Sequence, residues 1–309
     1  MLALEPRRAP VTFLEQPCKS ALNPVSGMGF KWSLNPYMGC EHRCTFCYVR
    51  AYELRADRPS GDGYGRTVRV KVNVAEVLRR ELARPRWRRE TVVIGAATDP
   101  YQPAEGRYRL TRSCLQALHD FATPASLITR SPMVVRDVDV LSRLAGRAEV
   151  SVSFSLPTLD LDVWRRTEPG TAPPGQRLRA LEKLVGAGIR AGVAMAPILP
   201  GISDRPEQLE AVVKAAREAG ATNLWAGMLH LRPGTREHFL ESLARHWPQL
   251  LPRYQAMYAR GAYLPRPLAE PALSLVGDLK QRHRIADRRS LRLEPPTPPP
   301  TPQQLALLA

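Results

Sequence analysis

The sequence predicts an α/β fold in which parallel βα units form a barrel or a partial barrel. Short apolar runs alternate with longer amphipathic stretches about six times along the chain, which is typical of parallel strands joined by helices. No G-x-G-x-x-G follows a predicted strand and no G-x-x-x-x-G-K-[ST] is present, so the doubly wound nucleotide-binding folds lose support. A chain of 309 residues is long enough for one large domain of this kind or for two ordinary domains. A barrel would have its active site at the carboxyl ends of the strands.

The strands are predicted from short apolar runs that turn residues interrupt. The most distinct run is 91–97 (TVVIGAA), which is followed by a loop at Thr98-Asp99-Pro100. Its length and its lack of polar residues are typical of a buried strand. The other strands are predicted over 30–35, 125–129, 149–156, 190–198 and 223–231.

The helices between these strands are predicted from apolar residues that recur every three or four positions. Asn73 is expected to cap a helix over 74–82, whose apolar side chains fall on one face. Thr111 is expected to cap a second helix, and Asp137 to start a third that runs to Leu144. Two more are predicted over 178–187, ended by Gly188, and from Pro206 to a stop at Gly220.

The pattern divides the chain into four regions, of which the barrel is expected to span 31–235. Residues 1–30 are interrupted by Pro and Gly, and we interpret them as an N-terminal extension that lies on the core. From 236 to 292 we expect helices without strands, ending in a basic run at 280–292 (KQRHRIADRRSLR). Residues 293–309 contain a proline tract that cannot build a core, so we expect a disordered tail there.

The charge of the chain favours a polyanionic partner. Lys and Arg number 45 against 29 Asp and Glu, a net charge of +16, and nucleic acid is the first candidate partner. The aromatic residues show no regular interleaving with the arginines, so a stacking platform for single strands is not evident. The basic run at 280–292 is typical of a solvated tail, and non-specific phosphate contact is the alternative.

No apolar run approaches the roughly 18 residues of a membrane span, and we expect a cytoplasmic protein with no membrane partner.

Three of the five cysteines, Cys40, Cys44 and Cys47, lie within eight residues, directly after the first predicted strand. Three thiolates at this C-x3-C-x2-C spacing can bind one face of an iron–sulfur cube and leave the fourth iron without a protein ligand. Gly39 allows the backbone a tight turn beside them. The alternative is zinc bound by the three cysteines and His42, although structural zinc sites usually pair two knuckles and the sequence has no second Cys or His pair.

The cysteine spacing, with Phe46 before the third cysteine, resembles the signature of the radical S-adenosylmethionine (SAM) superfamily. Further segments resemble the motifs of the branch related to spore photoproduct lyase, in the expected order, over residues 19–265. These segments are 98–105 (TDPYQPAE) with 108–112, 129–132 with Arg136-Asp137, Glu168-Pro169, Arg177-Leu178, and 196–201 (APILPG). Residues 19–23 and 260–263 look most like an actinobacterial-type subgroup whose members generally lack an assigned reaction.

This resemblance implies a partial (β/α)6 TIM-type barrel with a C-terminal helical extension. It also implies a four-iron, four-sulfur (4Fe-4S) cluster on Cys40, Cys44 and Cys47, with SAM as the second cofactor. SAM would be cleaved to methionine and a 5′-deoxyadenosyl radical that takes hydrogen from the substrate. The enzyme would be of the lyase or oxidoreductase type, and the resemblance does not give its exact reaction. The electron would come from a donor protein such as a flavodoxin or a ferredoxin.

Eight residues are expected, by the same resemblance, to contact SAM. Phe46 should lie near the adenine, and Thr98 and Asp99 occupy the strand end that usually binds the methionyl amine. Asp99 replaces the usual glutamate and could instead cap a turn at Pro100. Arg130 is expected to bind the SAM carboxylate, and the alternative is a surface cation. Ser153 and Ser155 would bind the ribose hydroxyls, or they would only pack in the interior. Pro197 and Ile198 would present their backbone to the adenine, or they would simply end the strand. Glu168 and Arg177 are expected to form a structural ion pair.

The sequence departs from spore photoproduct lyases at one position that matters for the reaction. Those enzymes have a cysteine at the end of the second strand that returns hydrogen to the product radical. Here the strand end reads Gly95-Ala96-Ala97-Thr98, and Cys114 follows only on the next helix, so repair by the same route is not expected. We therefore expect a radical SAM enzyme acting on nucleic acid or another anionic macromolecule, with no catalytic residue assigned. The alternatives are a radical SAM maturase of a protein or small metabolite, and a non-enzymatic zinc or iron–sulfur protein that binds nucleic acid.

Overall fold

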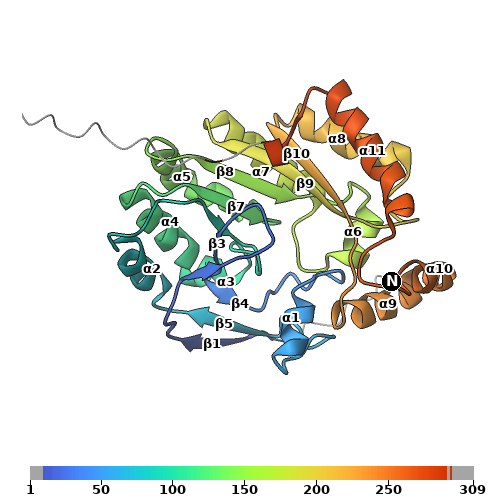
Figure 1. Cartoon of the computed structure of the whole chain (residues 1–309), viewed down its shortest axis with the longest axis horizontal. Coiled ribbons are helices and arrows are strands. Elements are labelled where there is room, and N and C mark those ends of the chain that lie inside the picture. Colours follow the sequence, from blue (N-terminus) through green and yellow to red (C-terminus); the bar gives the residue numbers. More distant parts are fainter. Residues whose placement is uncertain (1–9, 291–292, 294–309) are drawn as a thin grey trace, which may run out of the picture.

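The computed structural model describes residues 10–290 and residue 293, and its centre is an eight-stranded sheet (Figure 1). The strand order is β11-β10-β9-β8-β7-β6-β3-β2, and the six strands in the middle of the barrel all run parallel. They are β3 (Trp32–Leu34), β6 (Val92–Ile94), β7 (Ala125–Thr129), β8 (Val150–Ser155), β9 (Arg190–Ile198) and β10 (Asn223–Met228). The predicted partial (β/α)6 barrel is confirmed.

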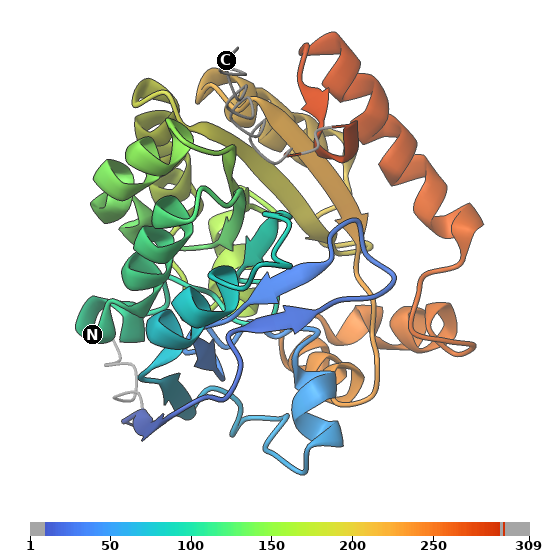
Figure 2. The ribbon, with the colours of Figure 1, turned by 60° about the vertical axis from the view of Figure 1, so that its left-hand side comes forward.

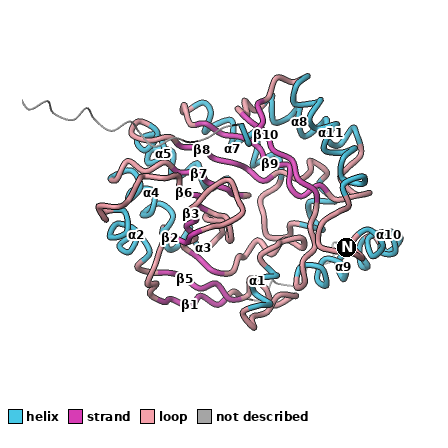
Figure 3. The backbone as a smooth tube through the Cα atoms, in the orientation of Figure 1, coloured by secondary structure: helices cyan, strands magenta, loops and turns pink. Residues whose placement is uncertain are grey.

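Helices lie outside most of this sheet (Figures 2 and 3). Buried apolar side chains from both layers form the main core. The helices are α1 (Arg50–Arg55), α2 (Val74–Leu82), α3 (Ala104–Tyr108), α4 (Leu110–Asp120), α5 (Val138–Ala145), α6 (Leu161–Thr167), α7 (Pro174–Gly186) and α8 (Pro206–Glu218). A 3-10 turn, η1 (Pro132–Asp137), precedes α5. Because the strands are parallel, all their carboxyl ends meet at one edge of the barrel.

Strand β6 is shorter than the predicted 91–97 because the chain leaves the sheet at Gly95. The φ angle of Gly95 is +91°, and a Cβ at this position would collide with the carbonyl oxygen of Ile128. Only glycine adopts this backbone readily at so close an approach. The residues after Gly95 therefore form a loop at the carboxyl edge of the barrel.

Three residues predicted to cap or start helices bind other parts of the chain with their side chains. The Asn73 amide precedes α2 but binds the backbone N–H and carbonyl of Cys18, at 2.7 and 3.2 Å. Thr111 lies inside the first turn of α4, and its hydroxyl donates to the Pro100 carbonyl at 2.6 Å. Asp137 precedes α5 as expected, yet its carboxylate accepts from side chains at Tyr101, Arg112 and Arg136. Sequence signals for caps are local, and here tertiary partners compete for the same atoms.

The predicted N-terminal extension lies on the core by joining two sheets. Strand β1 (Thr12–Gln16) pairs with β5 (Thr67–Lys71), which also pairs with β4 (Tyr37–Met38). Strand β2 (Leu22–Pro24) pairs antiparallel with β3 at the edge of the main sheet.

The C-terminal extension is helical as predicted, with one exception. It contains α9 (Thr235–His246), the turn η2 (Pro248–Leu250), α10 (Leu251–Met257) and α11 (Arg266–Arg282). The expectation of helices without strands is wrong at β11 (Ala286–Asp287), which pairs with the first residues of β10 and is followed by the turn η3 (Arg288–Ser290). No helix in the described part of the chain is both long enough and apolar enough to cross a membrane.

The described part of the basic run is folded, so its interpretation as a solvated tail is wrong. Ile285 is buried, and the Asp287 carboxylate binds both Lys280 and Arg289. The Arg288 guanidinium donates to the Ser126 hydroxyl at 3.2 Å, near the amino end of β7. This segment therefore covers the amino edge of the barrel, opposite the loops at the carboxyl edge. The proline tract lies outside the described residues.

Candidate active site

Three free cysteines lie on one loop at the carboxyl edge of the barrel. Cys40 and Cys44 are buried and Cys47 is half-buried. Glycines allow the surrounding backbone to pack closely: a Cβ at Gly39 would collide with the Thr67 carbonyl, and one at Gly65 with the Cys40 carbonyl. The role of Gly39 is predictable from the sequence because it precedes Cys40, whereas Gly65 is distant along the chain.

Arg50 fixes the shape of this loop, a role that the sequence alone did not suggest. Its buried guanidinium donates to the carbonyls of Arg43 and Cys44 at 3.2 and 3.3 Å, and to those of Ser60 and Gly61 at 2.6 Å each. Four carbonyl groups thus converge on one side chain, which is typical of an arginine that holds two loops together. In a chain this rich in arginine, nothing local distinguishes it.

The cysteine loop is also joined to the loop that follows β6. The Gln102 side chain, which is fully buried, donates to the Gly39 carbonyl at 3.1 Å and accepts from the Glu41 N–H at 3.0 Å. The Glu41 carboxylate in turn accepts from the Ala104 N–H at 2.8 Å. These reciprocal bonds hold the cysteines against the strand-end residues.

Cys44 and Cys47 lie largely away from solvent. Burial raises the pKa of the Cys44 and Cys47 thiols, and Cys47 Sγ lies 3.6 Å from the Tyr64 hydroxyl. Phe46 and Cys44 belong to an apolar cluster with side chains from α9 and α10. Three free thiols on one close-packed loop are the donor set that an iron–sulfur cluster requires.

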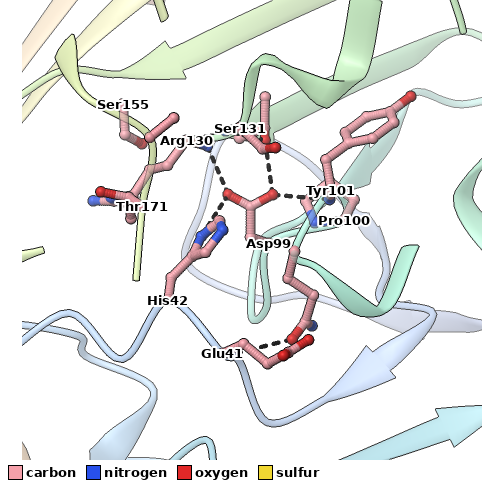
Figure 4. A network of polar contacts seen from close by, with 12 residues as sticks. Glu41, His42, Asp99, Pro100, Tyr101, Arg130, Ser131, Ser155 and Thr171 are labelled. Carbon is pink, nitrogen blue, oxygen red and sulfur yellow. Dashed lines mark hydrogen bonds and ion pairs between the residues drawn. The ribbon is translucent and has the colours of Figure 1, made fainter. Parts of the chain in front are cut away.

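The alternative zinc ligand, His42, is directed toward Asp99. Its Nδ1 atom lies 3.3 Å from Asp99 Oδ2, and both side chains are buried (Figure 4). Burial alone would lower the pKa of His42, but the Asp99 carboxylate and Cys40 outweigh burial and raise that pKa. Within the described residues, no three Cys, His, Asp or Glu side chains are grouped around a single metal-ion position.

Both carboxylate oxygens of Asp99 accept hydrogen bonds from the protein. Its Oδ1 accepts from the Tyr101 N–H at 2.9 Å and from the Thr129 hydroxyl at 2.7 Å, and its Oδ2 accepts from the Arg130 N–H at 2.6 Å (Figure 4). Burial opposes ionisation, but His42 and these donors outweigh it, so the pKa of Asp99 is lowered. The geometry supports the turn-capping alternative for Asp99, and its assignment to SAM stays a prediction.

Thr98, the other residue at this strand end, is buried. Its hydroxyl donates to the Tyr37 carbonyl at 3.0 Å, and its N–H donates to Asn35 Oδ1 at 3.3 Å. The two hydrogen bonds fix Thr98 between β6 and the chain that enters the cysteine loop.

Arg130 is held over Phe46 at the end of β7 and is not a surface cation. Its guanidinium carbon lies 5.5 Å from the Phe46 ring centroid, and Nε donates to Glu168 Oε1 at 2.7 Å. Glu168 is fully buried and also binds Arg177 at 3.1 Å, which confirms the predicted ion pair. Arg177 donates further to the Ser155 carbonyl at 2.9 Å. Two arginines thus share one carboxylate.

The remaining predicted residues lie on the next two strands. Ser153 and Ser155 are buried on β8, and the Ser153 hydroxyl has no hydrogen-bond partner among the described residues. Pro197 and Ile198 end β9, beside the Ala196 carbonyl, which lies 3.5 Å from Arg130 Nη2. The structure therefore joins Phe46, Asp99 and Arg130 in one network, while the other five surround it on neighbouring strand ends.

Comparison with protein families identifies a match over most of this region. The model of the radical SAM superfamily matches residues 34–210, which include the cysteine loop and the ends of β6 to β9. An uncharacterised protein of Mycobacterium tuberculosis is 40% identical over 295 residues, covering 94% of this chain and 85% of its own length. An uncharacterised protein of Acidianus two-tailed virus is 30% identical over 224 residues, covering 69% of this chain and 71% of its own length.

Among solved structures, spore photoproduct lyases have a similar fold. A mutant of that enzyme with bound AdoMet and dinucleoside spore photoproduct superposes with a TM-score of 0.67 at 15% sequence identity. The match covers 88% of this chain and 79% of that chain.

Proposed function

The chain belongs to the radical SAM superfamily, and we propose that it binds a 4Fe-4S cluster through Cys40, Cys44 and Cys47 and cleaves SAM reductively. It is a radical SAM enzyme, so the non-enzymatic alternative loses its basis. The observation that supports the cluster assignment most strongly is the set of three free thiols on one glycine-packed loop at the carboxyl edge of the barrel. The bound cluster would supply the electron that breaks the sulfur–C5′ bond of SAM, giving methionine and a 5′-deoxyadenosyl radical.

The protein's own contribution is to position SAM and to exclude water. We assign the Arg130 guanidinium to the SAM carboxylate, since Glu168 fixes its orientation and its planar fork suits a carboxylate. The Phe46 ring, which Arg130 covers, is assigned to the adenine side of the site. A buried hydroxyl without a partner costs about 1–3 kcal/mol, so the Ser153 hydroxyl is a suitable partner for a ribose hydroxyl.

The other proposed contacts have weaker support. Thr98 and Asp99 already bind protein atoms, so we assign them chiefly to shaping the site. Ser155 at the end of β8, and Pro197 and Ile198 at the end of β9, would line the SAM site through their backbone and by packing.

We assign the substrate to nucleic acid or another anionic macromolecule because of the net charge of +16. A protein or small-metabolite substrate is the second candidate. The electron donor would be a flavodoxin or ferredoxin in the cytoplasm, where thiols stay reduced.

Reversal of spore photoproduct by the lyase route is not part of the proposal. Residues 95–98 at the end of β6 include no cysteine. Cys114 lies fully buried in the main core on α4, with its pKa raised by burial, so it cannot replace that thiol at the site. We expect no repeated repair when the reduced enzyme is incubated with spore-photoproduct DNA and SAM, and multiple turnovers would require another hydrogen donor.

The cluster assignment is tested by anaerobic reconstitution with iron and sulfide. We expect about four irons and four sulfides per chain, with iron–sulfur absorbance. Substituting Cys40, Cys44 or Cys47 by Ala should abolish both, whereas Cys18→Ala and Cys114→Ala should retain them. Stoichiometric zinc without iron–sulfur absorbance would contradict the assignment.

A further inference from the structure

Four rings form a continuous series beside the cysteine loop, which we call the ring ladder: Tyr52, Tyr48, His230 and Tyr263. The centroids of Tyr52 and Tyr48 are 6.2 Å apart, and those of Tyr48 and His230 are 5.9 Å apart. His230 and Tyr263 are stacked at 5.5 Å with an interplanar angle of 13°. Such spacings are typical of aromatic pairs that attract one another.

The ring ladder leads from the cysteine loop to the surface. Tyr48 directly follows Cys47, and His230 lies just beyond the carboxyl end of β10. A β-bridge joins His230 to Tyr263, and the Thr235 hydroxyl donates to the Cys47 carbonyl at 3.0 Å. The start of α9 therefore lies against α1, as Figure 1 shows at the lower edge of the molecule.

Both ends of the ring ladder are exposed and have an arginine. Tyr263 is 65% exposed and Tyr52 is 43% exposed, which is unusual for rings that serve only the core. The Arg55 guanidinium lies 5.7 Å from the Tyr52 ring centroid, and Arg232 Nη2 lies 3.5 Å from the Tyr263 hydroxyl. Exposed rings with arginines at both ends offer stacking faces and phosphate donors together.

His230, one of the two inner rings of the ladder, is uncharged at neutral pH. Burial and the adjacent Arg232 lower the pKa of His230 below its ordinary value. The imidazole is therefore neutral at pH 7 and stacks on Tyr263 without a charge of its own.

Two other basic features of the molecule suit a polyanion less well. At Tyr108, the covering Arg107 lies 3.8 Å from the Glu15 carboxylate, which also binds the Tyr108 hydroxyl at 2.8 Å. The basic segment after α11 covers the opposite edge of the barrel, and its Arg289 binds Asp287.

We propose that the ring ladder binds an unpaired base of a single-stranded nucleic acid, stacked on the exposed face of Tyr263, with Arg232 at the adjacent phosphate. This inference rests on the proposed nucleic-acid substrate and deepens it, because it places the strand where it enters the site. A base has a π face whatever its identity, so binding depends on the ring and on salt more than on sequence. A duplex hides those faces and binds more weakly.

The test measures fluorescence anisotropy of a short labelled oligothymidylate, and of an oligouridylate of equal length, with the reconstituted protein. Tyr263→Leu keeps apolar bulk without a π face, and we expect it to weaken binding by roughly tenfold or more. Tyr263→Phe keeps the ring and should bind as the wild type does. Tyr108→Leu is the matched control, since it removes another arginine-covered ring, and it should leave affinity unchanged. The tighter of the two oligonucleotides assigns the strand as DNA or RNA.

Salt dependence tests the phosphate contact separately. Arg232→Gln should reduce the slope of log affinity against log salt by about 0.7, the value for one single-strand phosphate. Wild-type affinity in Tyr263→Leu, or equal binding of a duplex, would overturn the ring ladder as the site while leaving a nucleic-acid substrate in place. If the wild type does not bind either oligonucleotide even at low salt, both the ring ladder as a binding site and nucleic acid as the substrate are overturned. Formation of 5′-deoxyadenosine would still test SAM cleavage independently.

Discussion

Glu168 illustrates how one buried carboxylate organises the candidate site. Burying a charge is costly unless it is paired, and Glu168 pairs with Arg130 on one side and Arg177 on the other. Arg177 is buried among backbone carbonyls, whereas Arg130 faces the Phe46 ring. Burial raises the pKa of the nearby Cys44 thiol, and the Arg130 guanidinium partly opposes that shift.

Replacing Arg130 should therefore affect SAM more than the cluster. We expect Arg130→Ala to weaken SAM binding by roughly tenfold or more, since it removes a charged hydrogen-bonding group. Arg130→Lys keeps the charge without the planar fork and should give an intermediate affinity. Equilibrium SAM binding and iron content, measured on the same samples, separate the two effects. Unchanged SAM affinity in Arg130→Ala would exclude its proposed role.

Replacing Glu168 should instead affect folding. Glu168→Gln leaves the fully buried Arg177 without its anion, which is expected to cost about 3–5 kcal/mol in the free energy of unfolding. Glu182, exposed on α7, offers a matched control, and Glu182→Gln should change that free energy by less than about 0.5 kcal/mol. Urea denaturation of the apoprotein measures both. Equal stability of the two variants would show that the buried pair contributes little.

At the scale of elements, the loop after β6 supports the cysteine loop. Asp99 binds backbone and side-chain donors on its own loop and on β7, and His42 contacts it from the cysteine loop. Three elements therefore meet at one carboxylate, and a change there should alter both stability and cluster retention.

Asp99→Ala tests this role. The substitution leaves the Tyr101 and Arg130 N–H groups without an acceptor, and we expect a loss of about 3 kcal/mol or more in the free energy of unfolding. Iron content after reconstitution should fall as well. Asp139 pairs with Arg112 at the surface, so Asp139→Ala should cost less than about 1 kcal/mol. If Asp99→Ala retains both stability and iron, Asp99 does not support the loop.

The segment after α11 is a structural element as well. Ile285 is buried against the core, so Ile285→Ala should cost about 2–5 kcal/mol. Arg282 is exposed and forms a surface ion pair with Glu210, so Arg282→Gln should stay within about 0.5 kcal/mol. Thermal unfolding compares the two variants. A neutral Ile285→Ala would restore the interpretation of this segment as a solvated end.

At the scale of the whole molecule, the features that could be predicted are those that depend on local sequence patterns. The parallel strands follow from apolar runs, and the cysteine loop follows from spacing within eight residues. Arg50 and Gln102 were missed because their roles depend on backbone groups that only the fold brings to them. The ring ladder was missed for the same reason, since Tyr48 follows the cysteine loop and Tyr263 belongs to the C-terminal extension. The basic run at 280–292 was misjudged because a buried apolar residue within it, Ile285, gives no periodic signal.

The basic C-terminal segment and the candidate active site lie at opposite edges of the barrel. The described part of the basic C-terminal segment lies at the amino edge of the barrel, while the thiols and the ring ladder lie at the carboxyl edge. Removing the chain after Gly277 would take away the buried Leu279 and Ile285, so it would destabilise the fold as well as remove cations. Single substitutions at each edge are therefore the sharper way to locate nucleic-acid binding.

Formation of 5′-deoxyadenosine tests the central claim most directly. The protein is reconstituted anaerobically, reduced with dithionite and mixed with SAM, and the products are separated by chromatography. We predict slow accumulation of 5′-deoxyadenosine and methionine without added substrate, and none from Cys44→Ala. An intact, reduced cluster that forms no 5′-deoxyadenosine, with a spectrum that SAM does not change, would contradict the assignment.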